Sequence, residues 1–251
     1  MSLSPLIVVT RPEPAASALV ARLVSAGHSA LALPLIRVGP VAEQEEARGR
    51  LSAALPADVL VFTSAEGVRQ SVSLAGVEAL NAQPIVVPGP GTAAVAATSG
   101  LKQVCFPPAG GTSEAMLTLP ELESVKGRRV LILAAADGRR KLDKVLGQRG
   151  ARVERLVVYE RTPVEPDWQA LSAISRAGQV IVLVTSSEVL RRLGELIAPE
   201  QRMQDGWLTL LVASSRLAGI ARDSGFVQVI NAGAADDASM LEVLAGMDVI
   251  R

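Results

Sequence analysis

Residues 59–64 read Val-Leu-Val-Phe-Thr-Ser, and residues 180–186 read Val-Ile-Val-Leu-Val-Thr-Ser. Each apolar run has the length of a strand, and each ends in hydroxylated residues of the kind that commonly begin a helix. Apolar runs without alternation are typical of parallel strands whose two faces are both covered by helices. The two stretches therefore predict an α/β protein.

Working outward, short apolar runs alternate with helical patterns along the whole chain, which predicts doubly wound parallel sheets. Several helical patterns end at a glycine, a common helix C-terminal signal. The strands are expected at Leu6–Val9, Ser29–Leu33, Val59–Phe62, Ile85–Val87, Gln103–Phe106, Val130–Leu133, Arg152–Tyr159, Val180–Val184, Leu208–Val212 and Gln228–Asn231. The helices are expected at Ala15–Ala26, Ala65–Ala75, Thr92–Thr98, Arg139–Gln148, Ser187–Leu196 and Ser215–Ser224.

Two stretches resemble connections between lobes, since each is a β-prone run closed by proline: Pro34–Pro40 and Leu156–Pro163. If the chain crosses twice, the two runs can pair as a two-stranded ribbon, and one lobe joins the N- and C-terminal parts. Two continuous halves divided near residue 126 are the alternative. A weak self-similarity at an offset of 122 to 125 residues is consistent with two lobes of like construction.

Composition narrows the function. The chain has 251 residues, and its 25 Lys and Arg balance 25 Asp and Glu, so a sequence-independent nucleic-acid binder is not expected. A single cysteine and a single histidine, Cys105 and His28, exclude a disulfide within the chain and the usual zinc sites. We expect no signal peptide at the N-terminus, and the uncharged stretch Ala79–Leu101 holds too many prolines and glycines for a membrane helix. A cytoplasmic protein is expected.

Candidate binding residues follow the strands, because ligands of α/β sheets lie beyond the carboxyl ends of the strands. Small hydroxylated residues and glycines open helices there, and such turns offer backbone N–H groups to a carboxylate or a phosphate. Ordinary helix capping is the alternative for each turn taken alone. The candidates are Thr10, Arg11, Thr63, Ser64, Gly91, Thr92, Ser113, Arg139, Thr185, Ser186, Ser214, Ser215 and Arg216.

Two further features bear on the chemistry. Gly89–Ala94 fits the dinucleotide-binding pattern G-x-G-x-x-A, but the next strand ends without the acidic residue that would hold a ribose. Tyr159 is the single tyrosine and lies in a proposed connection beside Arg161. A phenol keeps its proton at neutral pH and can donate it to a leaving oxygen. The alternative is a tyrosine that only packs.

Taken together in their order, the motifs resemble those of the uroporphyrinogen-III synthase family, whose members close the tetrapyrrole ring. The resemblance covers essentially the whole chain. The motifs are Thr10–Pro12, Pro34–Ile36, Asp58–Ser64, Gly89–Ala93, Ser113-Glu114, Leu131–Arg140 with Leu146 and Gly150, Val158–Arg161, Thr185–Ser187, and Ser214–Arg216 with Gly225-Phe226.

The resemblance implies a discontinuous lobe of residues 1–36 and 163–251 and a second lobe of residues 40–157, joined by a two-stranded ribbon near residues 34–40 and 156–163. It implies hydroxymethylbilane as substrate and uroporphyrinogen III, with its last pyrrole ring inverted, as product. Neither a cofactor nor a metal is expected. In the family a tyrosine assists departure of the substrate hydroxyl, and Tyr159 matches it as the catalytic residue.

Two other classes of function remain open at this point. A non-catalytic two-lobed protein that closes on a small acid would share the same turns, and a nucleotide-dependent enzyme would bind NAD or ATP. A monomer is expected because no long apolar seam stands out, and a transient contact with the preceding enzyme of the pathway is compatible with it.

Overall fold

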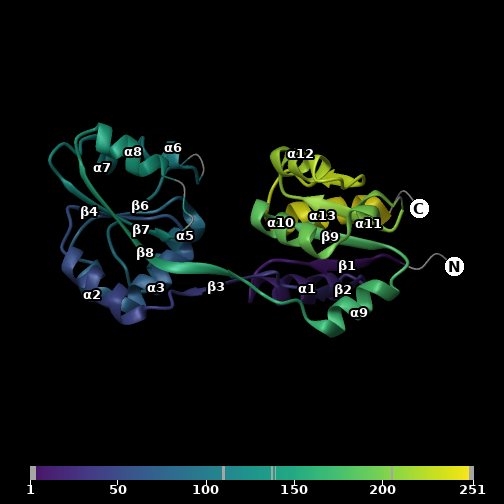
Figure 1. Ribbon diagram of the computed structural model, residues 1–251. Coiled ribbons are helices and arrows are strands. Elements are labelled where there is room, and N and C mark those ends of the chain that lie inside the picture. Colours follow the sequence, from purple (N-terminus) through teal and green to yellow (C-terminus); the bar gives the residue numbers. More distant parts are fainter. Residues whose placement is uncertain (1–3, 109–110, 137, 139, 205, 249–251) are drawn as a thin grey trace. The chain divides into compact units, whose positions relative to one another are not determined.

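The computed structural model describes residues 4–108, 111–136, 138, 140–204 and 206–248. The chain divides into two compact units. Unit 1 comprises Met1–Arg37 and Thr162–Arg251, and unit 2 comprises Val38–Arg161. In each unit helices surround a sheet (Figure 1).

Unit 1 contains a five-stranded sheet in the order β11-β10-β9-β1-β2, and all neighbouring strands are parallel. The sheet joins the two ends of the chain, because Leu6 of β1 pairs with Val180 of β9. The elements of unit 1 are β1 (Leu6–Val9), α1 (Ala15–Ser25), β2 (Ser29–Ala32), α9 (Trp168–Arg176), β9 (Val180–Val184), α10 (Ser187–Leu196), α11 (Pro199–Met203), β10 (Leu208–Val212), α12 (Ser215–Asp223), β11 (Val229–Asn231) and α13 (Asp237–Asp248).

Unit 2 carries a sheet in the order β3-β8-β7-β4-β5-β6. The pairs from β8 to β6 are parallel. The strands are β3 (Ile36–Pro40), β4 (Val59–Phe62), β5 (Ile85–Val86), β6 (Val104–Cys105), β7 (Arg129–Ala135) and β8 (Arg152–Pro163). The helices are α2 (Gln44–Ala54), α3 (Ala65–Ala75), α4 (Val77–Leu80), α5 (Pro90–Thr98), α6 (Ser113–Met116), α7 (Pro120–Glu123) and α8 (Lys141–Gln148).

Strand β4 shows why the decisive stretch is apolar throughout. Leu60 and Phe62 belong to the core cluster that includes residues of α2, α3 and α5. Val59 and Val61 belong to the opposite cluster, which includes residues of α6, α7 and α8. Both faces of the sheet are therefore covered, and the predicted doubly wound α/β class is confirmed.

Strands β3 and β8 contain the two points where the chain passes between units. The unit boundaries fall between residues 37 and 38 and between residues 161 and 162, one inside each strand. The two strands are hydrogen-bonded neighbours in the sheet order of unit 2. Both passages are thus extended chain rather than loop.

The predicted strands all form, and the predicted helices form with ends shifted by two residues or fewer. Gly27 and Gly225 follow α1 and α12 with φ of +90° and +89°, the left-handed region in which glycine is unstrained. The prediction lacked three longer helices, α2, α9 and α13. Helix α2 is mostly polar and contains Gly49, so its sequence has little helical periodicity.

Candidate active site

Three serines at strand ends adopt one arrangement. Ser64, Ser186 and Ser214 are the N-caps of α3, α10 and α12. Each side-chain oxygen accepts a backbone N–H three residues later, at 3.1, 3.2 and 3.3 Å respectively. The helix-capping interpretation therefore holds for all three. The other N–H groups of each first turn can still donate to an anion.

Only one of these serines also contacts a tyrosine. The Ser64 hydroxyl donates to Tyr159 Oη at 2.9 Å, although the residues are 95 positions apart in the sequence. Tyr159 is only 2% exposed to solvent, whereas Ser64 is half-buried. In the part of the chain that the structure describes, the acceptor of the Ser64 hydroxyl proton is Tyr159 Oη. We call Tyr159, Ser64 and Gly67 the tyrosine site.

A β-bulge turns Tyr159 toward α3. Ala134 of β7 pairs with Val157 of β8, but the next residue, Ala135, pairs with Tyr159, so Val158 is the extra residue. Paired residues of parallel strands face the same side of the sheet. Tyr159 consequently joins the core cluster on the α3 face, with Ala135. A regular register would place Tyr159 on the other face, away from Ser64.

Gly67, in the first turn of α3, completes the site. Its N–H is the donor to Ser64 Oγ. A Cβ at this position would lie 3.3 Å from the carbonyl oxygen of Leu133, 3.5 Å from Ser64 Oγ and 3.7 Å from Tyr159 Cε1. The missing side chain therefore lets α3 approach β7 and the tyrosine ring closely. Nothing in the residue spacing had pointed to Gly67.

The tyrosine ring also lies near a cation. The Arg161 guanidinium carbon is 5.8 Å from the ring centroid, at the outer range of a cation–π contact. Arg161 comes from the same strand, two residues beyond Tyr159.

The other candidates in unit 2 lie at the carboxyl ends of the same sheet. Gly91 and Thr92 are in the first turn of α5, where Thr92 N–H donates to the Gly89 carbonyl at 3.1 Å. Thr63 N–H donates to the Leu133 carbonyl at 3.3 Å. Ser113 is the first residue of α6, but Thr112 is the cap.

Two basic residues at the beginning of α8, Arg140 and Lys141, pair with carboxylates. Arg139 lies outside the described residues. Lys141 Nζ donates to Glu114, and this hydrogen bond lowers the pKa of the Glu114 carboxyl. Arg140 pairs with Asp143 at 3.4 Å.

Asp143 is held mainly by a buried arginine. The side chain of Arg155 is 5% exposed, and its Nε and Nη2 contact the two carboxylate oxygens of Asp143 at 2.7 and 2.5 Å. Burial raises the pKa of Asp143, but the hydrogen bonds and charge of Arg155 outweigh it, so the pKa is lowered overall. This pair ties α8 to β8.

In unit 1, the candidates follow three adjacent strands, β10, β9 and β1. Thr185 and Ser186 follow β9, while Ser214, Ser215 and Arg216 follow β10, with the Arg216 side chain exposed. The Ser215 hydroxyl oxygen accepts from Asn231 Nδ2 at 3.1 Å. This edge therefore presents two capped helix N-termini and one exposed guanidinium.

Thr10 and Arg11, after β1, have partners within the protein. Thr10 is buried, and its hydroxyl donates to the Leu183 carbonyl at 2.6 Å. The Arg11 guanidinium contacts Asp237 and donates to the Ala235 carbonyl at 2.5 Å. Asp237 also pairs with Arg22 at 2.6 Å. Both residues thus join distant parts of unit 1, and Arg11 holds the beginning of α13.

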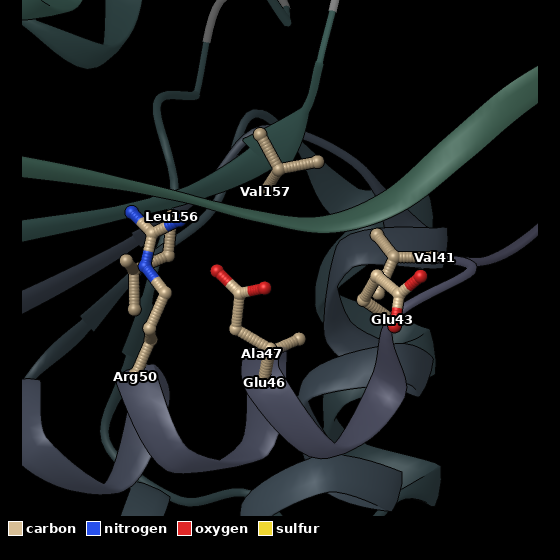
Figure 2. Close-up of a pocket in the computed structure, with 7 residues that line it drawn as sticks. All are labelled: Val41, Glu43, Glu46, Ala47, Arg50, Leu156 and Val157. Carbon is tan, nitrogen blue, oxygen red and sulfur yellow. The ribbon is translucent and has the colours of Figure 1, made fainter.

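Three hollows lie away from these strand ends. One of about 150 Å³ lies between α2 and β8, where Glu43, Glu46 and Arg50 line it opposite Val157 (Figure 2). One of about 400 Å³ is lined by Arg129, Arg152 and Glu154 near the amino ends of β7 and β8. A largely apolar one of about 460 Å³ lies in unit 1, lined by residues of α9, α10 and α11. Neither Ser64 nor Tyr159 lines any of the three.

The described residues contain no group of three or more His, Cys, Asp or Glu placed to hold a metal ion. In the same part of the chain no helix is long and apolar enough to span a bilayer. Cys105 is half-buried, and its thiol donates to Glu121 Oε1 at 3.2 Å.

Fold and site together define a two-unit α/β protein whose sheets carry polar helix N-termini at the carboxyl ends of their strands. The model of the family described as "Uroporphyrinogen-III synthase HemD" matches residues 17–242. The uroporphyrinogen-III synthase of Escherichia coli K12 is 33% identical over 250 residues, covering 95% of this chain and 99% of the relative. That of Salmonella typhimurium is 33% identical over 246 residues, covering 95% and 99%. The chain belongs to the uroporphyrinogen-III synthase family.

Solved structures agree with the fold. The uroporphyrinogen-III synthetase of Helicobacter pylori has a TM-score of 0.66 at 15% identity, covering 98% of this chain and 100% of that one. A mutant uroporphyrinogen III synthase of Thermus thermophilus has a TM-score of 0.64 at 18% identity, covering 98% and 99%. At these identities the comparison speaks for the fold alone.

Proposed function

We propose that this chain is a lyase that cyclises hydroxymethylbilane to uroporphyrinogen III, with loss of water and inversion of the last pyrrole ring. Family membership over residues 17–242 is the observation that carries the proposal. The net reaction removes one water and involves no net oxidation, so its chemistry needs no redox cofactor.

The enzyme must determine which carbon of the last pyrrole ring forms the new bond. Loss of the substrate hydroxyl gives an electrophilic azafulvene. The linear tetrapyrrole can then close to a ring without inversion, even in the absence of an enzyme. To form the inverted isomer, the enzyme must hold the conformer in which the substituted carbon of the last ring attacks, giving a spiro intermediate that fragments and recloses. Holding reacting groups in one geometry is a large source of rate enhancement.

The acetate and propionate carboxylates of the substrate are the groups through which the protein can hold it in that orientation. The first turns of α3, α5, α10 and α12 present N–H groups at the carboxyl ends of their sheets. Each can receive a carboxylate, and the helix dipole adds to the attraction. Arg216, exposed beside Ser215, adds a guanidinium that can pair with a carboxylate in two hydrogen bonds.

Tyr159 is the proposed source of the proton for the departing hydroxyl. The hydrogen bond from Ser64 and the neighbouring Arg161 guanidinium support the assignment, because both favour the negative charge left on the phenol oxygen. Arg11 and Thr10 have a different proposed role, the support of α13 and β9, because their polar groups are engaged within unit 1.

We further propose a cytoplasmic monomer. Because Cys105 is the single cysteine, folding requires no disulfide within the chain. Light scattering coupled to size exclusion would give a mass near 26.1 kDa for the monomer and twice that for a dimer. Broadening of that peak by the enzyme that supplies hydroxymethylbilane would reveal a transient contact.

The test is isomer analysis of the product. Purified protein supplied with hydroxymethylbilane is expected to give uroporphyrinogen III faster than the unaided substrate gives the non-inverted type I isomer. If the protein only binds a small acid, hydroxymethylbilane will quench or shift its fluorescence, yet only type I product will form at the uncatalysed rate.

A further inference from the structure

The proposed proton donor is more deeply buried than its hydrogen-bond partner. Tyr159 is buried, with only 2% of the residue exposed to solvent, and it belongs to the core cluster that contains Leu133, Ala135 and Val68. Ser64 is half-buried and stands at the beginning of α3, at the carboxyl edge of the sheet. Ser64 therefore presents surface to the solvent at this edge, whereas Tyr159 presents almost none.

From this difference we infer that Ser64 delivers the Tyr159 proton to the substrate. The inference rests on the proposed function and changes which residue touches the reacting atoms. The C–O bond of the hydroxymethyl group breaks with its electron pair on oxygen, and that oxygen takes the Ser64 proton and leaves as water. In the structure the Ser64 hydroxyl donates to Tyr159 Oη, so both hydroxyl groups rotate before the transfer: Tyr159 then donates to Ser64 Oγ, and Ser64 donates to the leaving oxygen. Ser64 Oγ takes the Tyr159 proton in the same step. The proton lost from the pyrrole when the ring closes returns to the phenolate.

The surroundings of Ser64 suit such a relay. Gly67 N–H donates to Ser64 Oγ at 3.1 Å and holds it in place. Tyr159 Oη lies 2.9 Å from the same oxygen. Once the hydroxyls have rotated, Ser64 Oγ accepts from Gly67 N–H and from Tyr159, and both hydrogen bonds polarise its own O–H toward the substrate oxygen. The helix N-terminus and Arg161 both stabilise the negative charge that moves inward to the phenol.

The bulge at Val158 and the bare Gly67 maintain this short connection. The bulge places Tyr159 on the α3 face, and the missing Cβ at position 67 lets the first turn of α3 lie against Leu133 and the ring. Both features act on the distance between the two hydroxyl oxygens. Val158 and Gly67 are therefore positioning residues.

The decisive experiment compares Tyr159→Phe, Ser64→Ala and the double variant by the initial rate of uroporphyrinogen III formation from hydroxymethylbilane. A relay loses its whole proton pathway when either hydroxyl is removed. Each single variant is then expected to lose the same factor in kcat, about 10²–10⁴, with little change in KM, and the double variant is expected to lose no more. Ser64→Thr keeps a hydroxyl and the cap, and should remain within about tenfold of the wild type.

A matched control separates the relay from simple loss of a helix cap. Asp167 caps α9 with an oxygen that accepts from Ala170 N–H at 3.0 Å, so Asp167→Ala removes an equivalent cap outside the proposed site. It should keep the wild-type rate. If Ser64→Ala loses only about tenfold, the value of one hydrogen bond, while Tyr159→Phe loses far more, the tyrosine meets the substrate itself and the relay is refuted. Absence of type III product from the wild type would refute the proposed function instead.

Discussion

Replacing Gly67 by alanine tests the packing of the tyrosine site. The added Cβ would lie 3.3 Å from the carbonyl oxygen of Leu133, closer than an unstrained contact, and that oxygen belongs to the backbone of β7. Relief requires α3 to move outward by a few tenths of an ångström, which also moves Ser64. Glycine to alanine inside a helix would otherwise stabilise by about 1 kcal/mol, whereas overpacking costs about 1–3 kcal/mol. We expect a net loss of up to about 2 kcal/mol and slower formation of uroporphyrinogen III.

Gly49→Ala is the matched control, because Gly49 is an exposed helical residue of the same unit whose added Cβ meets no atom within 4 Å. Thermal unfolding followed by circular dichroism should show Gly49→Ala slightly more stable than the wild type and Gly67→Ala less stable. The activity assay should show a reduced rate only for Gly67→Ala. If Gly67→Ala gains the same stability as Gly49→Ala and keeps full activity, the close approach of α3 has no consequence and this account of the site is wrong.

Three further predictions concern other contacts. Asp143 has a pKa below its ordinary value of 3.8, so its contribution to stability is complete above that pH and disappears as the pH falls through the lowered value. Asp143→Asn should therefore be less stable than the wild type in urea at pH 7, with the gap closing in acid; a constant gap would contradict this. Burial, followed by the hydrogen bond and charge of Glu121, raises the pKa of the Cys105 thiol. Iodoacetamide should alkylate Cys105 more slowly than free cysteine at pH 8, and Glu121→Gln should be faster; an unchanged rate would count against the contact. Ser186→Ala should cost about 1 kcal/mol through its lost cap and raise KM more than it lowers kcat, whereas an unchanged KM would remove α10 from the binding surface.

The sheets could be predicted because their signal is local. Val59–Phe62 is apolar at every position since its side chains enter the cores on both faces, and the sequence itself shows that pattern. The serine caps were equally visible, because a hydroxyl after a strand is a short-range signal. Helix α9 offered a cap of the same kind, Asp167, whose significance emerged only with the structure.

Long-range pairing was the part that the sequence concealed. Arg11 resembled an anion ligand at a strand end, but its partner Asp237 lies 226 residues away. The bulge at Val158 also leaves no signal in the sequence, because it depends on how β8 pairs with β7 and not on the residue type at position 158. The sequence placed Tyr159 in a β-prone run, whereas its partner Ser64 and its face of the sheet follow from that pairing.

The proposed role of Tyr159 is tested most directly by the rate at which Tyr159→Phe forms uroporphyrinogen III, measured beside the wild type by separation of the type I and type III isomers in timed samples. We expect a loss of about 10²–10⁴-fold, with the remaining enzymatic product still of type III because the orienting turns are untouched. A variant that forms type III at the wild-type rate would contradict it.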